Sequence, residues 1–364
     1  MRFFSFSSKA ICGITFVLAA SLLIARAQTW PVQAGDFHIQ NFQFKDGKSL
    51  PDLRLTFLTL GQPHRNAAGR VDNAVLLLHG TGGEAGSLLA PQFSGVLFGP
   101  GQLLDIKRYY LIFPDEIGHG QASKPSDGLH AKFPKYDYDD MVAADHAMLM
   151  DGLHIDHLRL ILGTSMGCMQ AFVWGETYPQ FADALMPLAC LPVPLAGRNR
   201  MVRKMAMDAI QSDPAYMGGE YKTQPMQGLT AAIDILTIMS SSPLQMQKAA
   251  PTRDEADALA ARTVAARMKG TDANDFIYQF NSSRNYDPSA KLGTITVPVM
   301  WINSADDFIN PPELGIAEKM SPLLKHGTFV LIPTSDATRG HGTHTQAAVW
   351  QKYLKKLLDE SGAK

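Results

Sequence analysis

The chain has 364 residues, of which 46% are hydrophobic and 18% are charged, and its 33 Lys and Arg against 34 Asp and Glu give a formal charge of −1. This composition excludes intrinsic disorder, a collagen-like fibre and a strongly basic nucleic-acid-binding protein. Three cysteines in a chain of this length are too few for a disulfide-stapled mini-protein. A globular protein with one large core remains, and such a core needs no metal for its stability.

The first 27 residues have the pattern of a secretory signal peptide. Arg2 and Lys9 precede an apolar run over residues 10–24, and Ala25-Arg26-Ala27 places small residues two positions apart. An uncleaved anchor is the competing interpretation, but the shortness of the run and its ending favour cleavage after Ala27. We therefore expect a periplasmic or secreted protein with no stable membrane insertion after cleavage.

Cleavage would remove Cys12 and leave Cys168 and Cys190 in the mature chain. These two cysteines could pair in an oxidising compartment. Both lie in segments that we expect to be buried, and the sequence therefore favours two free apolar thiols.

Short apolar runs that alternate with helical segments predict an α/β fold, with a mostly parallel sheet covered by helices. Two partly alternating segments come first, at residues 37–44 and 53–60, and predict an antiparallel pair. Further strands are expected at residues 74–78, 109–113, 158–162, 184–190, 297–302 and 328–332. Helices are predicted between several of them, including residues 138–153 and 166–178.

The alternation stops between about residues 191 and 291. Helices alone are predicted there, at residues 200–211, 228–240, 253–269 and 272–281, and eight of the 17 methionines fall in this stretch. These methionines could fill gaps in a helical core or form an adaptable apolar wall over a substrate pocket. We expect an α/β core, residues 28–192 and 292–364, interrupted by a helical cap at residues 193–291, before the last two strands.

Gly163-Thr164-Ser165-Met166-Gly167 is a G-x-S-x-G motif between a predicted strand and a predicted helix. In that setting the serine sits in a strained turn that exposes its hydroxyl, and the two glycines avoid collisions. The pattern alone is weak, but its position after a strand and before a helix makes Ser165 the candidate nucleophile.

A serine nucleophile of this kind requires a carboxylate and a histidine, which follow it in that chain order. Asp306 and Asp307 follow the predicted strand at 297–302 and compete for the role of the acid. His341 lies on the loop after the last predicted strand, where the base belongs. His344 is the alternative, but we expect it at the start of the last helix, in the pocket or at the surface.

The oxyanion formed by serine attack needs preset hydrogen-bond donors. We assign one to the backbone N–H of Met166 and the other to Thr81 in the glycine-rich loop at residues 79–83. That loop lacks the lysine of a P-loop and the spacing of a dinucleotide-binding motif. The spacing of His341 and His344 does not suit a metal site, so we expect neither a metal nor a cofactor.

With these motifs the sequence resembles α/β-hydrolase-fold proteins, and specifically the homoserine O-acetyltransferase family, from about Val71 to the C-terminus. The most specific segments are residues 163–171 with Trp174 and Tyr178-Pro179, Asp213-Pro214 with Gly218-Gly219-Glu220-Tyr221, Gly228-Leu229, and Gly340-His341. The resemblance implies that Ser165 is the nucleophile, Asp307 the acid and His341 the base, with Thr81 and Met166 as oxyanion donors. It favours Asp307 over Asp306 because an Asp-x-x-x-Pro pattern, completed here by Pro311, is common after this strand in α/β-hydrolases.

The sequence departs from the family pattern in two places. Gly340-His341-Gly342 stands where the family usually has Gly-His-Asp, and residues 228–242 carry no arginine of the kind that recognises an amino-acid substrate. Arg198, Arg200 and Arg203 could take over the recognition of an anion, or they could form a solvated helix face.

We therefore expect a serine hydrolase that acts on a small carboxylic ester or related acyl compound through an acyl-enzyme. Acetyl-CoA and homoserine are scarce outside the cell membrane, where water is the default acyl acceptor. The alternative is an O-acyltransferase of the homoserine O-acetyltransferase type with the same triad, and a third is a non-catalytic binding protein. The expected partner is a small-molecule acyl substrate and not a nucleic acid, and a homodimer stays open.

Overall fold

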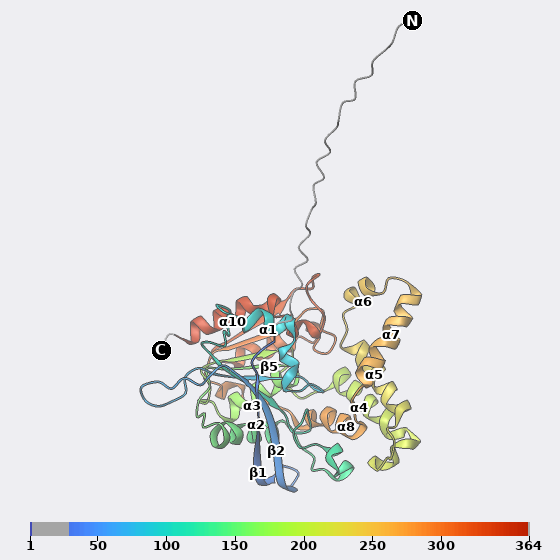
Figure 1. Ribbon diagram of the computed structural model, residues 1–364, viewed down its shortest axis with the longest axis horizontal. Coiled ribbons are helices and arrows are strands. Elements are labelled where there is room, and N and C mark those ends of the chain that lie inside the picture. Colours follow the sequence, from blue (N-terminus) through green and yellow to red (C-terminus); the bar gives the residue numbers. More distant parts are fainter. Residues whose placement is uncertain (2–28, 363–364) are drawn as a thin grey trace.

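The computed structural model describes Met1 and residues 29–362, so the predicted signal peptide lies almost entirely outside the described residues. An eight-stranded sheet forms the centre of the molecule, with the order β1-β2-β4-β3-β5-β6-β7-β8 (Figure 1). β1 pairs antiparallel with β2, and β2 with β4, whereas all other neighbours are parallel. The strands are β1 (Gln33–Gln43), β2 (Ser49–Leu60), β3 (Ala74–Leu78), β4 (Tyr110–Asp115), β5 (Leu160–Thr164), β6 (Leu185–Leu188), β7 (Val299–Ser304) and β8 (Gly327–Ile332).

Every predicted strand is present, and the differences lie at the strand ends. β6 ends before residue 190 because Ala189 has a φ of +67°, which an extended strand does not allow. β7 begins at Val299 and not at residue 297, after Pro298, which has no N–H to give to a ladder. The mostly parallel sheet predicted from the apolar runs is confirmed.

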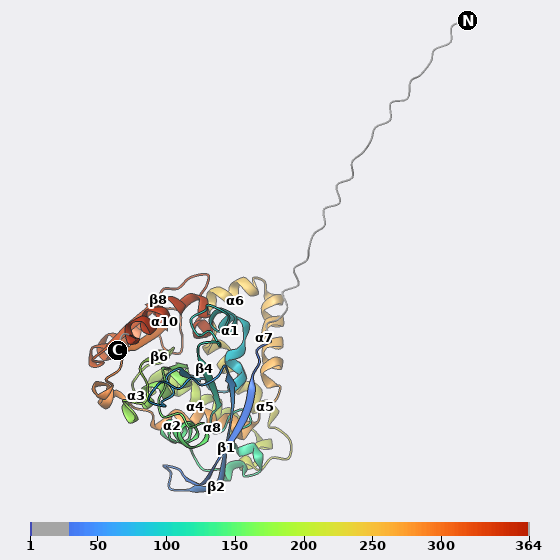
Figure 2. The same ribbon diagram turned by 60° about the vertical axis from the view of Figure 1, so that its left-hand side comes forward.

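Helices cover both faces of the sheet, because side chains of each strand alternate between two cores. In β3, Leu76 belongs to one core and Leu77 to the other. Helices α1 (Pro91–Leu97) and α10 (Ala347–Ser361) pack on one face, and α2 (Tyr138–Ala147) and α3 (Met166–Thr177) on the opposite face (Figure 2). The helix predicted at residues 138–153 ends as an α-helix at Ala147 and continues as a π-helical segment, Met148–Gly152.

Five α-helices lie between β6 and β7 in the chain and sit together beside the sheet in Figure 1. They are α4 (Gly197–Ser212), α5 (Met226–Met239), α6 (Pro243–Ala249), α7 (Arg253–Met268) and α8 (Ala273–Asn281). We call residues 197–281 the helical insertion. It has a small core of its own, which includes Ile210, Leu229 and Phe276. Sequence analysis missed α6, which begins at Pro243.

The methionines of the helical insertion do not form one wall. Met207 is buried in the core of the insertion, whereas Met201, Met205, Met217 and Met226 are exposed. Met207 therefore takes part in the helical core, as gap filling requires, and it also lines a cavity between α4 and α8.

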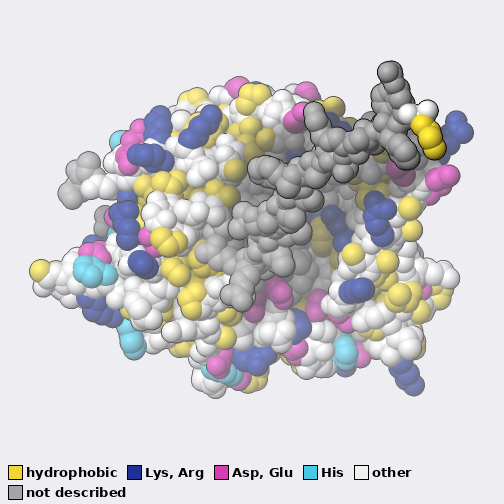
Figure 3. Space-filling view, turned by 45° about the horizontal axis from the view of Figure 1, so that its top comes forward, with side chains coloured by type: hydrophobic (Ala, Val, Ile, Leu, Met, Phe, Trp, Pro, Cys, Tyr) yellow, Lys and Arg dark blue, Asp and Glu magenta, His cyan; other side chains and the backbone are white. Residues whose placement is uncertain are grey.

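On the face drawn in Figure 3, lysines and arginines are interspersed with aspartates and glutamates. Among the described residues, none of the helices has the length and apolar character that a membrane span requires. A short helix, α9 (Ile316–Met320), precedes the last strand.

Candidate active site

The turn between β5 and α3 holds Ser165 in a strained backbone conformation. β5 ends at Thr164 and α3 begins at Met166, so Ser165 makes the whole connection with a φ of 54° and a ψ of −104°. A non-glycine residue with positive φ is energetically costly and persists where the surrounding structure enforces it. Here the Ser165 N–H donates to the Leu188 carbonyl at 2.8 Å, which ties the turn to the end of β6.

Glycines are required at both ends of this turn. A Cβ on Gly163 would lie 1.9 Å from the Gly167 carbonyl oxygen, and a Cβ on Gly167 would lie 2.4 Å from the Leu78 carbonyl oxygen. Both contacts are with backbone, which cannot move aside as a side chain could. The G-x-S-x-G pattern therefore reflects a close approach of β3, β5 and α3 around the serine.

His341 joins Ser165 and Asp307 in one line of hydrogen bonds. Its Nε2 lies 2.8 Å from Ser165 Oγ, and its Nδ1 lies 2.8 Å from Asp307 Oδ2. Because the carboxylate can only accept, Nδ1–H donates to Asp307, and Nε2 is left to accept the hydroxyl proton of Ser165. The chain brings together residues 165, 307 and 341 from the ends of three different strands.

Asp307 is held as a buried carboxylate. Its side chain is 1% exposed, and Oδ1 accepts the N–H groups of Ile309 at 2.7 Å and Asn310 at 3.2 Å. The Asn310 side-chain amide donates to Oδ2 at 3.0 Å. Burial raises the pKa of Asp307, but His341 and these donors outweigh burial, so the pKa lies below its ordinary value. Sequence analysis missed Asn310, which lies three residues after the acid in the same turn.

The second candidate acid, Asp306, does not contact the imidazole in the described residues. Its carboxylate accepts from the Gly340 N–H at 2.9 Å and from the hydroxyls of Ser304, Thr338 and Ser242. The structure thus gives the two neighbouring aspartates different partners.

Two further histidines near the site, the half-buried His344 and the fully buried His119, favour the neutral form of the imidazole. His344 lies in a 3-10 turn before α10, 5.2 Å from the His341 ring, and has no hydrogen bond to Ser165 or Asp307. Burial lowers the pKa of His344 to about 3, and the neighbouring His341 acts in the same direction. Burial, and then the nearby His79, lower the pKa of His119, which contacts the Ile117 carbonyl at 3.1 Å.

The glycine-rich loop after β3 runs directly past Ser165. A Cβ on Gly80 would lie 3.3 Å from the Ser165 Cβ, so the loop is in contact with the serine. In the described part of the chain, neither the Thr81 N–H nor the Met166 N–H donates to a protein acceptor. Both N–H groups are therefore available to a ligand, as an oxyanion requires.

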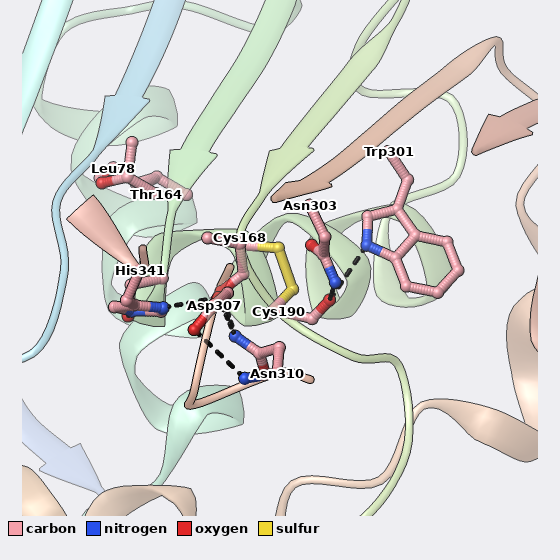
Figure 4. The surroundings of a disulfide bond; sticks show 11 residues. Leu78, Thr164, Cys168, Cys190, Trp301, Asn303, Asp307, Asn310 and His341 are labelled. Carbon is pink, nitrogen blue, oxygen red and sulfur yellow. Dashed lines mark hydrogen bonds and ion pairs between the residues drawn. A yellow bond between two sulfur atoms is a disulfide. The ribbon is translucent and has the colours of Figure 1, made fainter. Parts of the chain in front are cut away.

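The expectation of two free thiols is wrong, because Cys168 and Cys190 form a disulfide with a Cα–Cα distance of 5.8 Å. Cys168 lies in the first turn of α3, and Cys190 follows the end of β6 (Figure 4). Both cysteines are buried, as expected, but in the fold their sulfur atoms are adjacent and bonded to each other. The Cys190 carbonyl also accepts from Trp301 Nε1 and Asn303 Nδ2, at 2.9 and 3.1 Å.

The three arginines of α4 have different environments. Arg198 is exposed and donates to the Phe308 carbonyl, as a solvated position would allow. Arg203 is only 6% exposed and donates to Asn199 Oδ1 at 3.0 Å and to the Phe280 carbonyl at 3.3 Å. Among the described residues, no carboxylate lies within 4.0 Å of Arg200 or Arg203.

Burial lowers the pKa of Arg203, and Tyr138 is the neighbour that acts in the opposite direction. Burial raises the pKa of Tyr138, and Arg203 acts in the opposite direction. Among the described residues, Arg203 is therefore a buried guanidinium without a carboxylate partner.

A carboxyl pair is buried behind the nucleophile-bearing helix. Glu116 and Asp145 are each 1% exposed. Burial, and then the neighbouring Asp145, raise the pKa of Glu116, and burial raises the pKa of Asp145 to about 8. Burial thus favours the protonated form of both carboxyls over the ionised form.

Two further features complete the description of the site region. Within residues 29–362, no cluster of three or more His, Cys, Asp or Glu side chains could hold a metal ion. A cavity of about 580 Å³ lies between α4, α8 and the 131–136 segment, and Tyr136, Tyr216 and Tyr278 line it. None of its lining residues belongs to the Ser165–His341–Asp307 line.

Comparisons with known proteins identify the fold and the relatives of this chain. A family model described as alpha/beta hydrolase fold matches residues 73–336. A probable acyltransferase of Methanothermobacter thermautotrophicus is 27% identical over 311 residues, which are 85% of this chain and 92% of that protein. A homoserine O-acetyltransferase of Moorella thermoacetica is 28% identical over 370 residues, which are 89% of this chain and 96% of that protein.

Solved structures show the same fold. The homoserine O-acetyltransferase from Bacillus anthracis superimposes with a TM-score of 0.78 at 20% identity, covering 90% of this chain and 98% of that one. An acetylester hydrolase from Corynebacterium glutamicum gives 0.78 at 19% identity, with 90% and 96% covered. The predicted fold class is confirmed. Since the family model spans more than half of the sequence, the chain belongs to the α/β-hydrolase fold family, and it is an enzyme similar to the homoserine O-acetyltransferases.

Proposed function

We propose that the chain is a serine hydrolase that cleaves a small carboxylic ester or related acyl compound through an acyl-enzyme on Ser165. The observation that carries the proposal is the continuous line from Ser165 Oγ to His341 Nε2 and from His341 Nδ1 to Asp307, each step 2.8 Å long. A hydroxyl is a weak nucleophile unless a base removes its proton, and this line supplies both the base and the group that orients it.

In the first half-reaction, Ser165 Oγ attacks the carbonyl carbon of the ester while His341 Nε2 takes the hydroxyl proton. The carbonyl oxygen becomes an oxyanion, and the free N–H groups of Thr81 and Met166 stabilise it. His341 then gives the proton to the leaving alcohol, which departs and leaves an acyl-Ser165 ester. In the second half-reaction, His341 takes a proton from water, the hydroxide attacks the acyl carbon, and the proton returns to Ser165 as the acid leaves.

The helical insertion is proposed to act as a cap, as the sequence predicted for residues 193–291. Gln279 of α8 donates to the Gly118 carbonyl at 2.8 Å and lies 3.8 Å from where a Cβ on Gly82 would be. At the other side of the site, a Cβ on Gly340 would lie 2.6 Å from the Ser241 carbonyl oxygen. The insertion thus contacts both the glycine-rich loop and the loop that bears His341.

The environment of Arg203 supports the inference that the substrate carries a negative charge. A buried cation without a counter-ion is unfavourable, and a bound carboxylate would reduce this cost. Of the two interpretations of the α4 arginines, the anion-binding one suits Arg203, whereas a solvated helix face suits Arg198.

The second candidate function is an O-acyltransferase with the same triad. The names of the acyltransferase relatives favour it. The absence of arginine from α5 favours the hydrolase, since the sequence departs there from the family that acts on an amino acid. Water and an alcohol are alternative acceptors for the same acyl-Ser165, so the two functions share the first half-reaction.

We also propose that the protein is exported. The pattern of its first 27 residues supports this, and so does the disulfide, because disulfides persist mainly in oxidising compartments. Expression with and without these residues, followed by fractionation and mass determination of the mature N-terminus, tests both export and cleavage after Ala27.

The function is tested by active-site labelling. A fluorophosphonate probe should phosphonylate Ser165, with loss of fluoride and of the hydroxyl proton, and Ser165→Ala should abolish labelling and ester hydrolysis. A folded wild-type protein that is neither labelled nor active on any short-chain nitrophenyl ester would favour the binding protein instead. Faster release of nitrophenol on addition of an alcohol, with formation of the new ester, would favour the transferase over the hydrolase.

A further inference from the structure

Asp306 lies next to the proposed triad acid but has no part in the proposed reaction. Its Oδ2 accepts hydrogen bonds from the Gly340 N–H at 2.9 Å, from Thr338 Oγ1 at 2.9 Å and from Ser242 Oγ at 3.2 Å. Its Oδ1 accepts from the hydroxyl of Ser304. One carboxylate therefore collects four donors from three separate segments of the chain.

Two of these donors belong to the loop that carries the histidine. Thr338 is fully buried, and Gly340 directly precedes His341. Gly340 has a φ of +60°, a conformation that sets the direction of the chain just before the histidine. These hydrogen bonds, which Asp306 accepts, fix the chain on the N-terminal side of His341.

A third donor belongs to the helical insertion. Ser242 lies between α5 and α6 and is 4% exposed, and its hydroxyl points to the same Oδ2. The preceding residue, Ser241, has its carbonyl against Gly340, where a Cβ would lie 2.6 Å from the oxygen. The insertion and the histidine loop are therefore in direct contact, and Asp306 bonds to both.

Hydrogen bonds to an ionised carboxylate are stronger than those between neutral groups. Burial raises the pKa of Asp306, but the four donors outweigh it and keep the carboxyl ionised. The arrangement is also distinct from that of Asp307, which bonds to the imidazole itself. Asp306 acts on the backbone before His341 and on the insertion, and not on the reacting atoms.

We propose that Asp306 is a positioning residue, which couples the seating of the helical insertion to the placement of the His341 imidazole through its shared bonds to Ser242, Thr338 and Gly340. The proposal rests on the proposed function, because it concerns the proton transfer between His341 and Ser165. Small displacements of a catalytic group are costly to the reaction rate. Loss of the bonds between Asp306 and Ser242, Thr338 or Gly340 should therefore slow acylation more than it weakens substrate binding.

The test compares three variants by steady-state hydrolysis of a short-chain nitrophenyl ester and by the rate of fluorophosphonate labelling. Asp306→Asn removes the charge and sets an N–H₂ donor against neighbours that are themselves donors. Ser242→Ala removes only the hydrogen bond from the helical insertion. Ser241→Ala is the matched control, because its hydroxyl bonds locally to the Ile238 carbonyl. All rates are measured well below each variant's melting temperature.

We expect Asp306→Asn to lower kcat and the labelling rate by about tenfold or more, and Ser242→Ala by about threefold, with KM changed by less than about twofold. Ser241→Ala should match the wild type. If Ser242→Ala also matches the wild type, the coupling to the insertion is refuted. If a folded Asp306→Asn keeps full kcat and labelling rate and only melts earlier, Asp306 is a structural residue alone. Failure of the wild type to be labelled at all would instead count against the proposed function.

Discussion

Asp306 and Asp307 are adjacent in the chain, yet their carboxylates bond to two different residues of the loop that bears His341. Asp307 accepts from the imidazole Nδ1 of His341 at 2.8 Å, and Asp306 accepts from the N–H of Gly340, one residue earlier, at 2.9 Å. The first contact sets the tautomer of the base, and the second sets the course of its backbone. Substitution of the two aspartates should therefore have different effects on the rate of ester hydrolysis.

Asp307→Asn should lower kcat for ester hydrolysis by about 10⁴-fold, because an amide would donate to Nδ1 and leave the imidazole in the wrong tautomer. The loss should be far larger than for Asp306→Asn. The measurement is kcat on a nitrophenyl ester, with circular dichroism to show that both variants are folded. Equal losses in the two variants would mean that the roles are wrongly assigned.

Replacing Cys168 and Cys190 by alanine should lower the free energy of unfolding by about 3 kcal/mol, because the unfolded chain regains the freedom of a closed loop. The cysteines are 22 positions apart and tie the nucleophile helix to the segment after β6. Denaturant unfolding of both proteins, each with and without reductant, measures the effect. The wild type should lose stability with reductant and the double variant should not, and a double variant as stable as the oxidised wild type would contradict the prediction.

The Glu116–Asp145 pair should make the protein less stable as the pH rises. Burial raises the pKa of both groups in the folded state, that of Asp145 to about 8. Their contribution is therefore complete below the unfolded pKa of about 4 and is lost as the pH rises through about 8. Unfolding free energy measured from pH 4 to 9 should fall in the wild type by roughly a kcal/mol per pH unit for each proton released.

Glu116→Gln keeps the shape of the side chain but cannot ionise, so its stability should depend less on pH than that of the wild type. Asp257→Asn on the exposed face of α7 is the control and should follow the wild-type curve. Parallel curves for wild type and Glu116→Gln would show that the buried pair does not titrate in this range.

Gly167→Ala should be strongly destabilising and should inactivate the enzyme, because its Cβ would lie 2.4 Å from the Leu78 carbonyl oxygen. The backbone of β3 would have to move, and the glycine-rich loop that bears the proposed oxyanion donor Thr81 follows that strand. Gly95→Ala in α1 has open space around the added methyl group, and it should be neutral or stabilising. Soluble yield, thermal melting and kcat distinguish the two, and a fully active Gly167→Ala would contradict the backbone contact.

Arg203→Gln should reduce the preference for an ester whose acyl chain ends in a carboxylate over a neutral ester of equal length by about tenfold, because it removes the unpaired guanidinium. The measured quantity is the ratio of kcat/KM for the two esters. Arg198→Gln, at an exposed arginine of the same helix, should leave the ratio unchanged. Identical ratios in wild type and Arg203→Gln would mean that Arg203 does not meet the charged end of a substrate.

Several features followed from local pattern alone. The apolar runs from residue 74 onwards predicted strands because a strand covered on both faces must be apolar at every position. The G-x-S-x-G motif predicted the turn at Ser165 because only glycine fits beside the crossing backbone of β3. A serine, an aspartate pair and a histidine follow three of the predicted strands, in the chain order expected for a triad. This order was enough to nominate Ser165 and His341.

Other features depend on contacts between distant segments, and only the tertiary structure decided them. The pairing of Cys168 with Cys190 could not be inferred from burial, because the approach of α3 to the end of β6 determines it. The different partners of Asp306 and Asp307 depend on side-chain directions after β7. The bond that the Ser242 hydroxyl donates to Asp306 depends on the seating of an insertion some 60 residues away. Local sequence determines which elements form, since propensity and periodicity are short-range properties, whereas partners for charged and sulfur-containing side chains are chosen only when the sheet brings their strands together.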